Sequence, residues 1–200
     1  MPSPAATAFD VARGRARTVA ALSQDPRVRP LTRENSRLLL HIALAIYVAG
    51  WESYIERLIA NFFSEVFDPH LSKFVALHRV TSQLASSAAE KFHTPNWENA
   101  RDLLLQFSGY DPINDWIWPQ RSMGGPQVRE RLNQILKVRH SFAHGFPMPP
   151  FDWNTSAMGD ARLTVSAVRD TEAFFSNLIV QTDRGLGRHI QASYNPNLNW

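Results

Sequence analysis

The sequence feature that most constrains the fold is a long stretch of helical periodicity from Arg33 to Phe67. Its second half repeats large apolar side chains at steps of three and four residues, which is the spacing of one helix face. Its first half, from Leu38 onward, is apolar nearly all round, which is typical of a helix buried on more than one side. Thr32 is a suitable N-cap, and Asp68 followed by Pro69 ends the stretch. The sequence therefore predicts one long central helix.

Other segments with helical spacing surround this central helix. We expect them at residues 9–22, 71–91, 95–107, 126–144 and 171–190, with Thr94 and Asp170 as the N-caps of the fourth and the last helix in the chain. Residues 146–160 form an irregular loop rich in proline and aromatic residues, and residues 162–168 are expected to be extended. We expect one all-α domain over 1–200, with an arginine-rich N-terminal helix and linker in 1–32, a helical core in 33–190 and a coil tail in 191–200.

Composition narrows the chemistry of the chain. It contains no cysteine, which excludes structural disulfides, cysteine-type zinc sites and thiolate catalysis. The formal charge is +3 and the isoelectric point is 9.6. Arginines crowd the segment between Arg13 and Arg37, a basic bias that suits phosphate contacts and that an arginine-rich coding bias also produces.

No segment has the pattern of a signal peptide or of a membrane-spanning helix. The N-terminus lacks a basic region leading into an apolar one. The most apolar run, from Leu38 to Ala49, is interrupted by His41 and is shorter than the roughly 20 residues that span a bilayer. We therefore expect a soluble cytoplasmic protein with no membrane partner.

The most informative short motif runs from Arg139 to His144. It places an arginine, two histidines (His140 and His144) and the hydroxyl of Ser141 within six residues, directly before Gly145, which can end a helix. Arginine can hold a phosphate through two parallel hydrogen bonds, and histidine can move a proton near neutral pH. These residue types supply what metal-free cleavage of an RNA phosphodiester requires.

The helix wheel of residues 126–144 separates two faces. One edge carries a polar, basic stripe made of Arg129, Asn133, Lys137, His140 and His144. Arg139 is placed by the wheel on the apolar face, near Leu132 and Ile135, where a charge needs a partner or a polar ligand. A purely structural interpretation stays open, in which Arg139 pairs with Glu52 or Glu56 and His144 only caps the helix.

The stretch Val138–Gly145 resembles the signature of the HEPN superfamily, which is an arginine, a polar residue, three more residues and a histidine at the end of a late helix. The segment from Trp51 to Leu58 resembles the Trp-Glu segment of the RiboL-PSP subgroup of these proteins. The resemblance spans residues 36–190 and implies an all-α, HEPN-like helical bundle. The arginine-rich N-terminal segment and the loop at 146–160 have no counterpart in it.

What the resemblance implies is a metal-independent endoribonuclease that works as a homodimer, without a cofactor, and makes 2′,3′-cyclic phosphate and 5′-hydroxyl ends. Arg139 would hold the scissile phosphate, His144 would transfer a proton, and His140 would hold the RNA or tune its neighbour. We expect four more residues of this helix to bind RNA: Arg129, Asn133, Lys137 and Ser141. Trp51 and Glu52 would support the site structurally, and the biological setting would be a toxin or an antiphage effector, under the control of an antitoxin or sensor.

Several alternatives stay open. His140 and His144 could share a zinc ion, but Ser141 stands where the zinc-protease motif needs glutamate. Aromatic residues of the loop could stack on bases or cover the core: Phe146, Phe151 and Trp153. The domain could also be a non-catalytic binding or assembly module that partners another effector or an antitoxin, or a helical bundle that binds a nucleotide or other small molecule.

Overall fold

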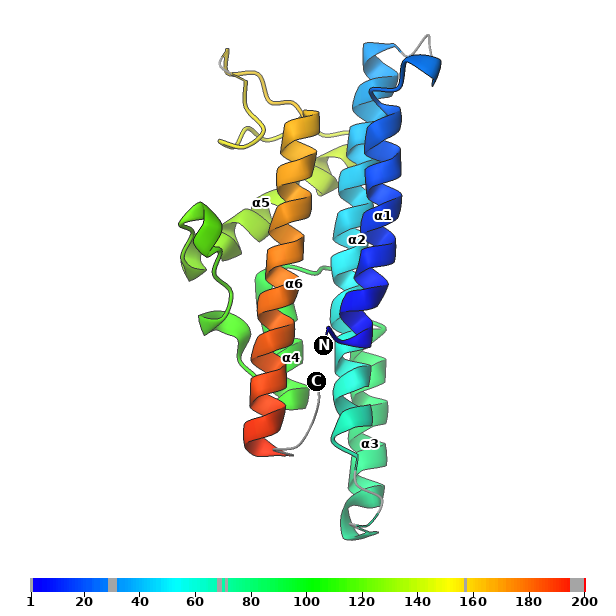
Figure 1. Cartoon of the computed structure of the whole chain (residues 1–200), viewed down its shortest axis with the longest axis vertical. Coiled ribbons are helices and arrows are strands. Elements are labelled where there is room, and N and C mark those ends of the chain that lie inside the picture. The colour runs from blue at the N-terminus through cyan, green and yellow to red at the C-terminus, as the bar shows by residue number, and fades with distance from the viewer. Residues whose placement is uncertain (1, 29–31, 68–69, 71, 157, 195–199) are drawn as a thin grey trace.

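The computed structural model describes residues 2–28, 32–67, 70, 72–156, 158–194 and 200, and within these residues it is helical without a β-strand (Figure 1). The α-helices are α1 (Pro4–Leu22), α2 (Arg33–Glu65), α3 (Ser72–Ala89), α4 (Trp97–Ser108), α5 (Gly125–Ala143) and α6 (Val165–Ser193). Short 3-10 turns lie at Pro26–Val28, Pro112–Asn114 and Pro119–Arg121. The prediction of an all-α fold is confirmed.

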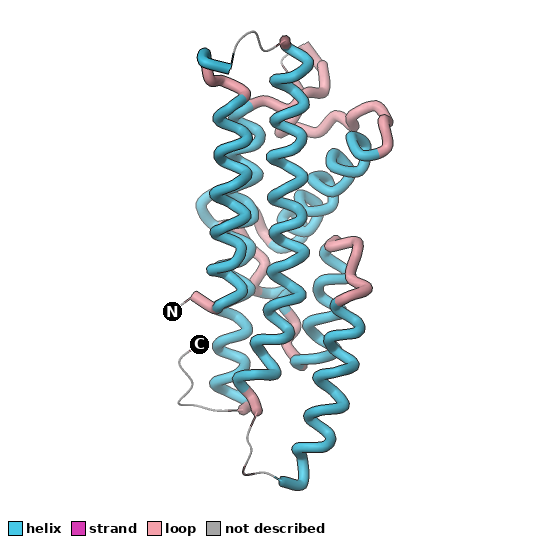
Figure 2. The backbone as a smooth tube through the Cα atoms, turned by 90° about the vertical axis from the view of Figure 1, so that its right-hand side faces the viewer, coloured by secondary structure: helices cyan, strands magenta, loops and turns pink. Residues whose placement is uncertain are grey.

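The long helix α2 is the centre of the bundle. It contacts each of the other five α-helices, and α1 and α6 run beside it along the long axis of the molecule while α5 crosses at a slant (Figures 1 and 2). Its side chains are buried along most of its length, from Leu40 to Phe63. By length and composition alone α2 could cross a membrane, although half of its most apolar window is buried inside the bundle. The apolar half therefore has packing partners within the chain.

The first helix begins at Pro4, five residues before the predicted start. Ser3 is the N-cap, and its hydroxyl accepts a hydrogen bond from the backbone N–H of Ala6. Ser3 also donates from its backbone N–H and its hydroxyl to the carboxylate of Asp183 in α6. Gly50 lets α1 approach α2 closely, because a Cβ atom there would lie 3.1 Å from the Phe9 ring. The start of α1 is thus fixed by contacts that sequence spacing does not reveal.

Two predicted N-caps are wrong. Helix α4 is capped by the side chain of Asn96 and not by Thr94, and α6 is capped by Thr164 and not by Asp170. Helix α6 therefore starts at Val165, so the expected extended stretch ends four residues earlier than predicted. The helix continues to Ser193, into the expected coil tail. Asp170 instead binds Arg121 and Arg131. The cap at Thr32 is confirmed, whereas the stop signal at residues 68–69 lies outside the described residues.

Candidate functional site

The motif helix α5 is fixed at both ends by local hydrogen bonds. At its start the backbone N–H of Gly124 donates to Oε1 of Gln127 at 2.6 Å. At its end the N–H of His144 donates to the carbonyl of His140, and Gly145 adopts a φ of +69°, which favours glycine. The N–H of Phe146 then donates to the carbonyl of Ser141 at 2.8 Å. This reversal returns the chain to the motif, so that Phe146 and Pro147 lie beside it.

The placement of Arg139 on the apolar face is wrong. The buried face of α5 is made of Val128, Arg131, Leu132, Ile135, Val138 and Ser141. At the end of the helix Ser141 is buried and Phe142 is exposed. The buried face is therefore rotated relative to the predicted one, and the Arg139 side chain is exposed. Phe142 is 38% exposed and stacks on the imidazole of His41 at a centroid distance of 4.3 Å. The arginine head is therefore free to meet a ligand and is not held inside the core.

A cavity of about 570 Å³ lies beside the face of α5 that carries Arg139. Its walls come from α2, from the segment that joins α3 to α4, from the first turn of α4, from α5 and from the loop that follows the motif. The charged and polar lining residues are Glu52, His93, Thr94, Asn96, Glu98, Asn133, Lys137, Arg139, His140 and Ser141. The apolar lining residues are Val48, Pro95, Leu136, Phe146, Pro147 and Pro149. The cavity combines cations on α5 with carboxylates on α2 and α4.

The structure brings six of the nine predicted site residues to the cavity lining and leaves His144, Arg129 and Trp51 outside it. Arg139, His140, Lys137 and Asn133 all line the cavity. His144 does not belong to the lining among the described residues, but its ring lies 4.2 Å from that of His140, centroid to centroid. Both rings lie about 6 Å from the ring of Phe146, at 6.0 and 5.9 Å. The two histidines therefore form one cluster at the end of α5.

Ser141 and Arg129 are less accessible to a ligand than predicted. The Ser141 side chain is buried, and its hydroxyl donates to the carbonyl of Val138 at 2.9 Å. The guanidinium of Arg129 lies over the Trp97 ring, 5.2 Å from its centroid, and Arg129 is not among the lining residues of the cavity. Both residues thus have structural contacts within the chain.

Trp51 and Glu52 occupy adjacent positions with different roles in the packing. Trp51 is fully buried, and its indole N–H donates to the carbonyl of Pro95 at 3.0 Å. Glu52 is half-buried in the cavity wall. Burial raises the pKa of Glu52, while the positive charge of Arg139 and the nearby His93 act in the opposite direction. Glu52 on the α2 wall and Arg139 of the motif therefore attract each other. They do not form the close ion pair that the structural interpretation of Arg139 requires.

Two titratable residues of the cavity lining were not predicted as site residues from the sequence. His93 reaches the cavity from the segment between α3 and α4, and Glu98 from the first turn of α4. Within the described part of the chain, Oε2 of Glu98 and Oδ1 of Asn133 have no hydrogen-bond donor although both atoms are shielded from solvent. No spacing in the sequence links either residue to the motif, because only the packing of α4 against α5 brings them together.

The loop after the motif is packed on α5 rather than free. Asn154 is buried, accepts the N–H of Phe151 and donates to the carbonyl of Pro149. Trp153 is half-buried, donates to Oε1 of Gln134 at 3.2 Å and lies under the guanidinium of Arg131. Of the three loop aromatics only Phe146 is exposed, at 60%. Phe151 and Trp153 therefore cover the core, whereas Phe146 is the one that a ligand can reach.

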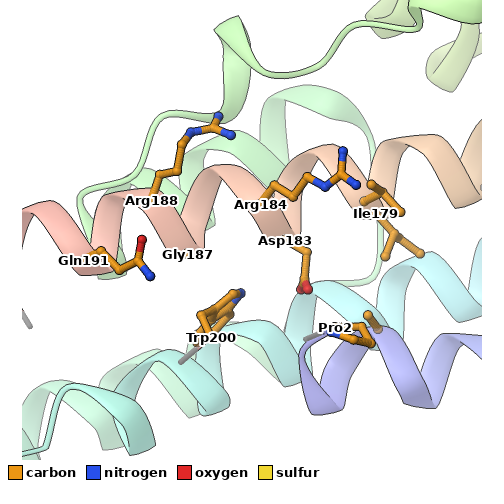
Figure 3. Close-up of a pocket in the computed structure, with 10 residues that line it drawn as sticks. Pro2, Ile179, Asp183, Arg184, Gly187, Arg188, Gln191 and Trp200 are labelled. Carbon is orange, nitrogen blue, oxygen red and sulfur yellow. The ribbon is translucent and has the colours of Figure 1, made fainter. Parts of the chain in front are cut away.

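A metal site and the cavity beside the start of α1 are weaker candidates than the motif cavity. Among the described residues no group of three or more histidine, aspartate or glutamate side chains could hold a metal ion. Another cavity, of about 510 Å³, lies between α6 and the start of α1. Figure 3 shows Asp183 directed towards Pro2 in that cavity, with Arg188 on the other side of α6. Asp183 accepts hydrogen bonds from Ser3 and Tyr54, and Arg188 forms an ion pair with Asp115. The charges of Asp183 and Arg188 therefore already have partners within the chain.

The fold and the site define an all-helical domain with an arginine and a histidine five positions apart at the end of its fifth helix. The sequence model of the RiboL-PSP-HEPN family matches residues 16–187, and the chain belongs to this family. The match confirms the resemblance and extends it towards the N-terminus, into α1. No curated protein and no solved structure matches the chain. Membership of the family points to a ribonuclease or a nucleotide-binding role.

Proposed function

We propose that this protein is a metal-independent endoribonuclease. The observation that carries the proposal is that Arg139 and His140 of the motif line one cavity together with Lys137. Arg139 and Lys137 would bind the phosphate, the first by two parallel hydrogen bonds and the second as a point charge. The cluster of His140 and His144 would take the proton of the ribose 2′-hydroxyl or deliver one to the leaving oxygen. Attack of the 2′-hydroxyl would leave a 2′,3′-cyclic phosphate and a 5′-hydroxyl.

The exposed apolar surface beside the motif supports a homodimer as the working form. Phe142 is 38% exposed, and Leu38 and Ile42, which flank its stacking partner His41, are 44% and 36% exposed. A two-fold interface over this surface would bury these side chains and bring two copies of the motif close to each other. Analytical ultracentrifugation measures this directly: a dimer that Phe142→Glu dissociates supports the proposal.

The direct test of activity uses purified protein with tRNA or total RNA in the presence of EDTA. We expect cleavage that is abolished by Arg139→Ala and strongly reduced by His144→Ala, with cyclic phosphate ends detected by mass spectrometry. Cleavage that survives both substitutions would exclude these residues as its source. The biological setting that we propose is a cytoplasmic toxin or antiphage effector held in check by an antitoxin or sensor.

The position of His144 favours a second candidate function. Because His144 lies outside the cavity lining, the domain could bind RNA or a partner protein without cutting it. Expression in a bacterium separates the two functions. A nuclease should arrest growth and lose that effect in the Arg139→Ala, His144→Ala double variant, whereas a binding module should be harmless in both forms.

A further inference from the structure

The reaction proposed above, on which this inference rests, needs two proton-transfer groups on different sides of the phosphate. When the 2′-oxygen attacks phosphorus in line, the 5′-oxygen leaves from the opposite side, so the proton acceptor and the proton donor cannot share one position. His140 and His144 both belong to the end of α5, and their rings lie 4.2 Å apart. A pair this close serves one side of the phosphate, and the other side needs a group from another wall.

The other walls of the cavity carry three groups that can transfer a proton, which are Glu52, His93 and Glu98. Glu52 reaches the cavity from α2, whereas Arg139 and His140 reach it from α5. Glu52 and Arg139 line the same cavity and attract each other, so the carboxylate shares the cavity with the guanidinium that would hold the phosphate. The neighbouring Trp51 is fully buried and hydrogen-bonded to Pro95, so the backbone that carries Glu52 is firmly held.

The charges around Glu52 suit a proton acceptor. Burial favours a protonated Glu52 carboxyl, whereas Arg139 from α5 and His93 from the segment before α4 favour its ionised form. The net effect is that the pKa of Glu52 is raised, and a carboxylate with a raised pKa takes a proton more readily near neutral pH. Lys137, His140 and Glu98 are the remaining charged or titratable groups of the cavity.

We propose that Glu52 is the general base of the reaction and that the histidine cluster is the general acid. The Glu52 carboxylate takes the proton of the 2′-hydroxyl as the 2′-oxygen forms its bond to phosphorus. The bond between phosphorus and the 5′-oxygen breaks, and an imidazolium of the cluster delivers its proton to that oxygen. Arg139 stabilises the charge on the non-bridging oxygens throughout.

The first experiment compares Glu52→Gln with Glu56→Gln, which is a matched control because Glu56 lies on the same helix but does not line the cavity. Glu52→Gln should lower kcat by about 100-fold or more, with little change in KM, whereas Glu56→Gln should leave both unchanged. In the wild-type protein kcat/KM should fall as the pH drops and Glu52 becomes protonated. That acid limb should be absent from the residual activity of Glu52→Gln and present in Glu56→Gln. Circular dichroism checks that both variants are folded.

The second experiment separates the acid from the base. The probe is an RNA oligonucleotide whose leaving 5′-oxygen, at the mapped cleavage site, is replaced by sulfur, since a thiolate leaves without a proton. The His140→Ala, His144→Ala double variant should recover most of its lost rate on this substrate, and Glu52→Gln should not. Recovery by Glu52→Gln, or an unaltered rate and pH profile in that variant, would overturn the assignment of Glu52. A wild-type protein that leaves all RNA intact would instead overturn the ribonuclease function itself.

Discussion

The indole N–H of Trp51 donates a 3.0 Å hydrogen bond to the carbonyl of Pro95, and this contact joins α2 to the segment that carries His93 into the cavity. The ring of Trp51 also packs against Tyr54, Trp116 and Phe175 at the centre of the core. The Trp-Glu pair is therefore a single structural unit, in which the tryptophan holds two walls together and the glutamate faces the cavity.

We expect Trp51→Phe to loosen the site as well as the core. The substitution removes the bond to Pro95 and leaves a gap, which should lower the free energy of unfolding by about 1–3 kcal/mol. Displacement of the cavity walls should lower the single-turnover rate of RNA cleavage by up to about 100-fold. Trp118→Phe is the control, because Trp118 is also buried but its ring packs against Phe174 and Arg121, neither of which lines the cavity. Equal rates for the two folded variants would contradict a positioning role for Trp51.

Glu52→Gln should stabilise the protein at neutral pH. Because burial raises the pKa of Glu52 above its ordinary value of 4.5, the folded chain binds this proton more tightly than the unfolded chain does. The wild-type protein therefore loses stability as the pH rises from about 4.5 through the raised pKa, and the loss persists above it. Thermal melts at pH 7.5 and pH 4 should give a higher Tm for the variant only at the higher pH. A lower Tm at pH 7.5 would mean that attraction to Arg139 outweighs burial.

Arg139→Lys should lower the rate of RNA cleavage strongly, although the substitution keeps the positive charge. A lysine ammonium cannot make the two parallel hydrogen bonds of a guanidinium, so we expect the cleavage rate to fall by about 100-fold. Arg129→Lys offers a matched comparison on the same helix, since Arg129 lies over the Trp97 ring and outside the cavity. Its rate should remain close to that of the wild type. Rates that fall equally in both variants would indicate general electrostatic attraction to RNA.

Asp170→Asn should destabilise the anchor between α5 and α6. Arg131 is nearly buried, its Nη2 lies 2.7 Å from the Asp170 carboxylate, and burial lowers the pKa of Arg131 to about 10. Loss of the carboxylate leaves a poorly solvated charge, with an expected cost of about 2–3 kcal/mol in urea unfolding. Arg121→Ala removes the exposed partner of the same carboxylate and should cost less than about 1 kcal/mol. The reverse order of the two effects would contradict this view of the anchor.

Gly185→Ala should be strongly destabilising, although it sits within a helix. A Cβ atom at Gly185 would overlap the Tyr110 hydroxyl and the Asp115 carboxylate, which are hydrogen-bonded to each other at 2.7 Å against α6. We expect a loss of about 1–3 kcal/mol from overpacking. Gly14→Ala, in the exposed part of α1 where nothing lies within 4 Å, should instead add up to about 1 kcal/mol. Chemical denaturation of the two variants measures whether each substitution lowers or raises the free energy of unfolding.

Sequence periodicity predicted the helices because each α-helix buries an apolar face, and Thr32 and Gly145 mark their ends by local chemistry. The sequence misplaced the start of α6, since Thr164 and Asp170 are equally good N-caps in isolation. In the fold Asp170 pairs with Arg131, and Thr164 caps the helix. The predicted rotation of α5 was also wrong, because burial of the Ser141 hydroxyl depends on its hydrogen bond to the carbonyl of Val138. His93 joins the cavity through tertiary packing, which no local pattern records.

The separation of charge across the cavity has a consequence for how any nucleotide would enter it. Lys137 and Arg139 attract an anionic end from the α5 side, while Glu52 and Glu98 repel it and attract amino groups. Two orientations of the same strand would therefore differ in energy before any base-specific contact forms. Such a polarised groove imposes a direction on the polymer, so the two sides of a cut site should contribute unequally to recognition.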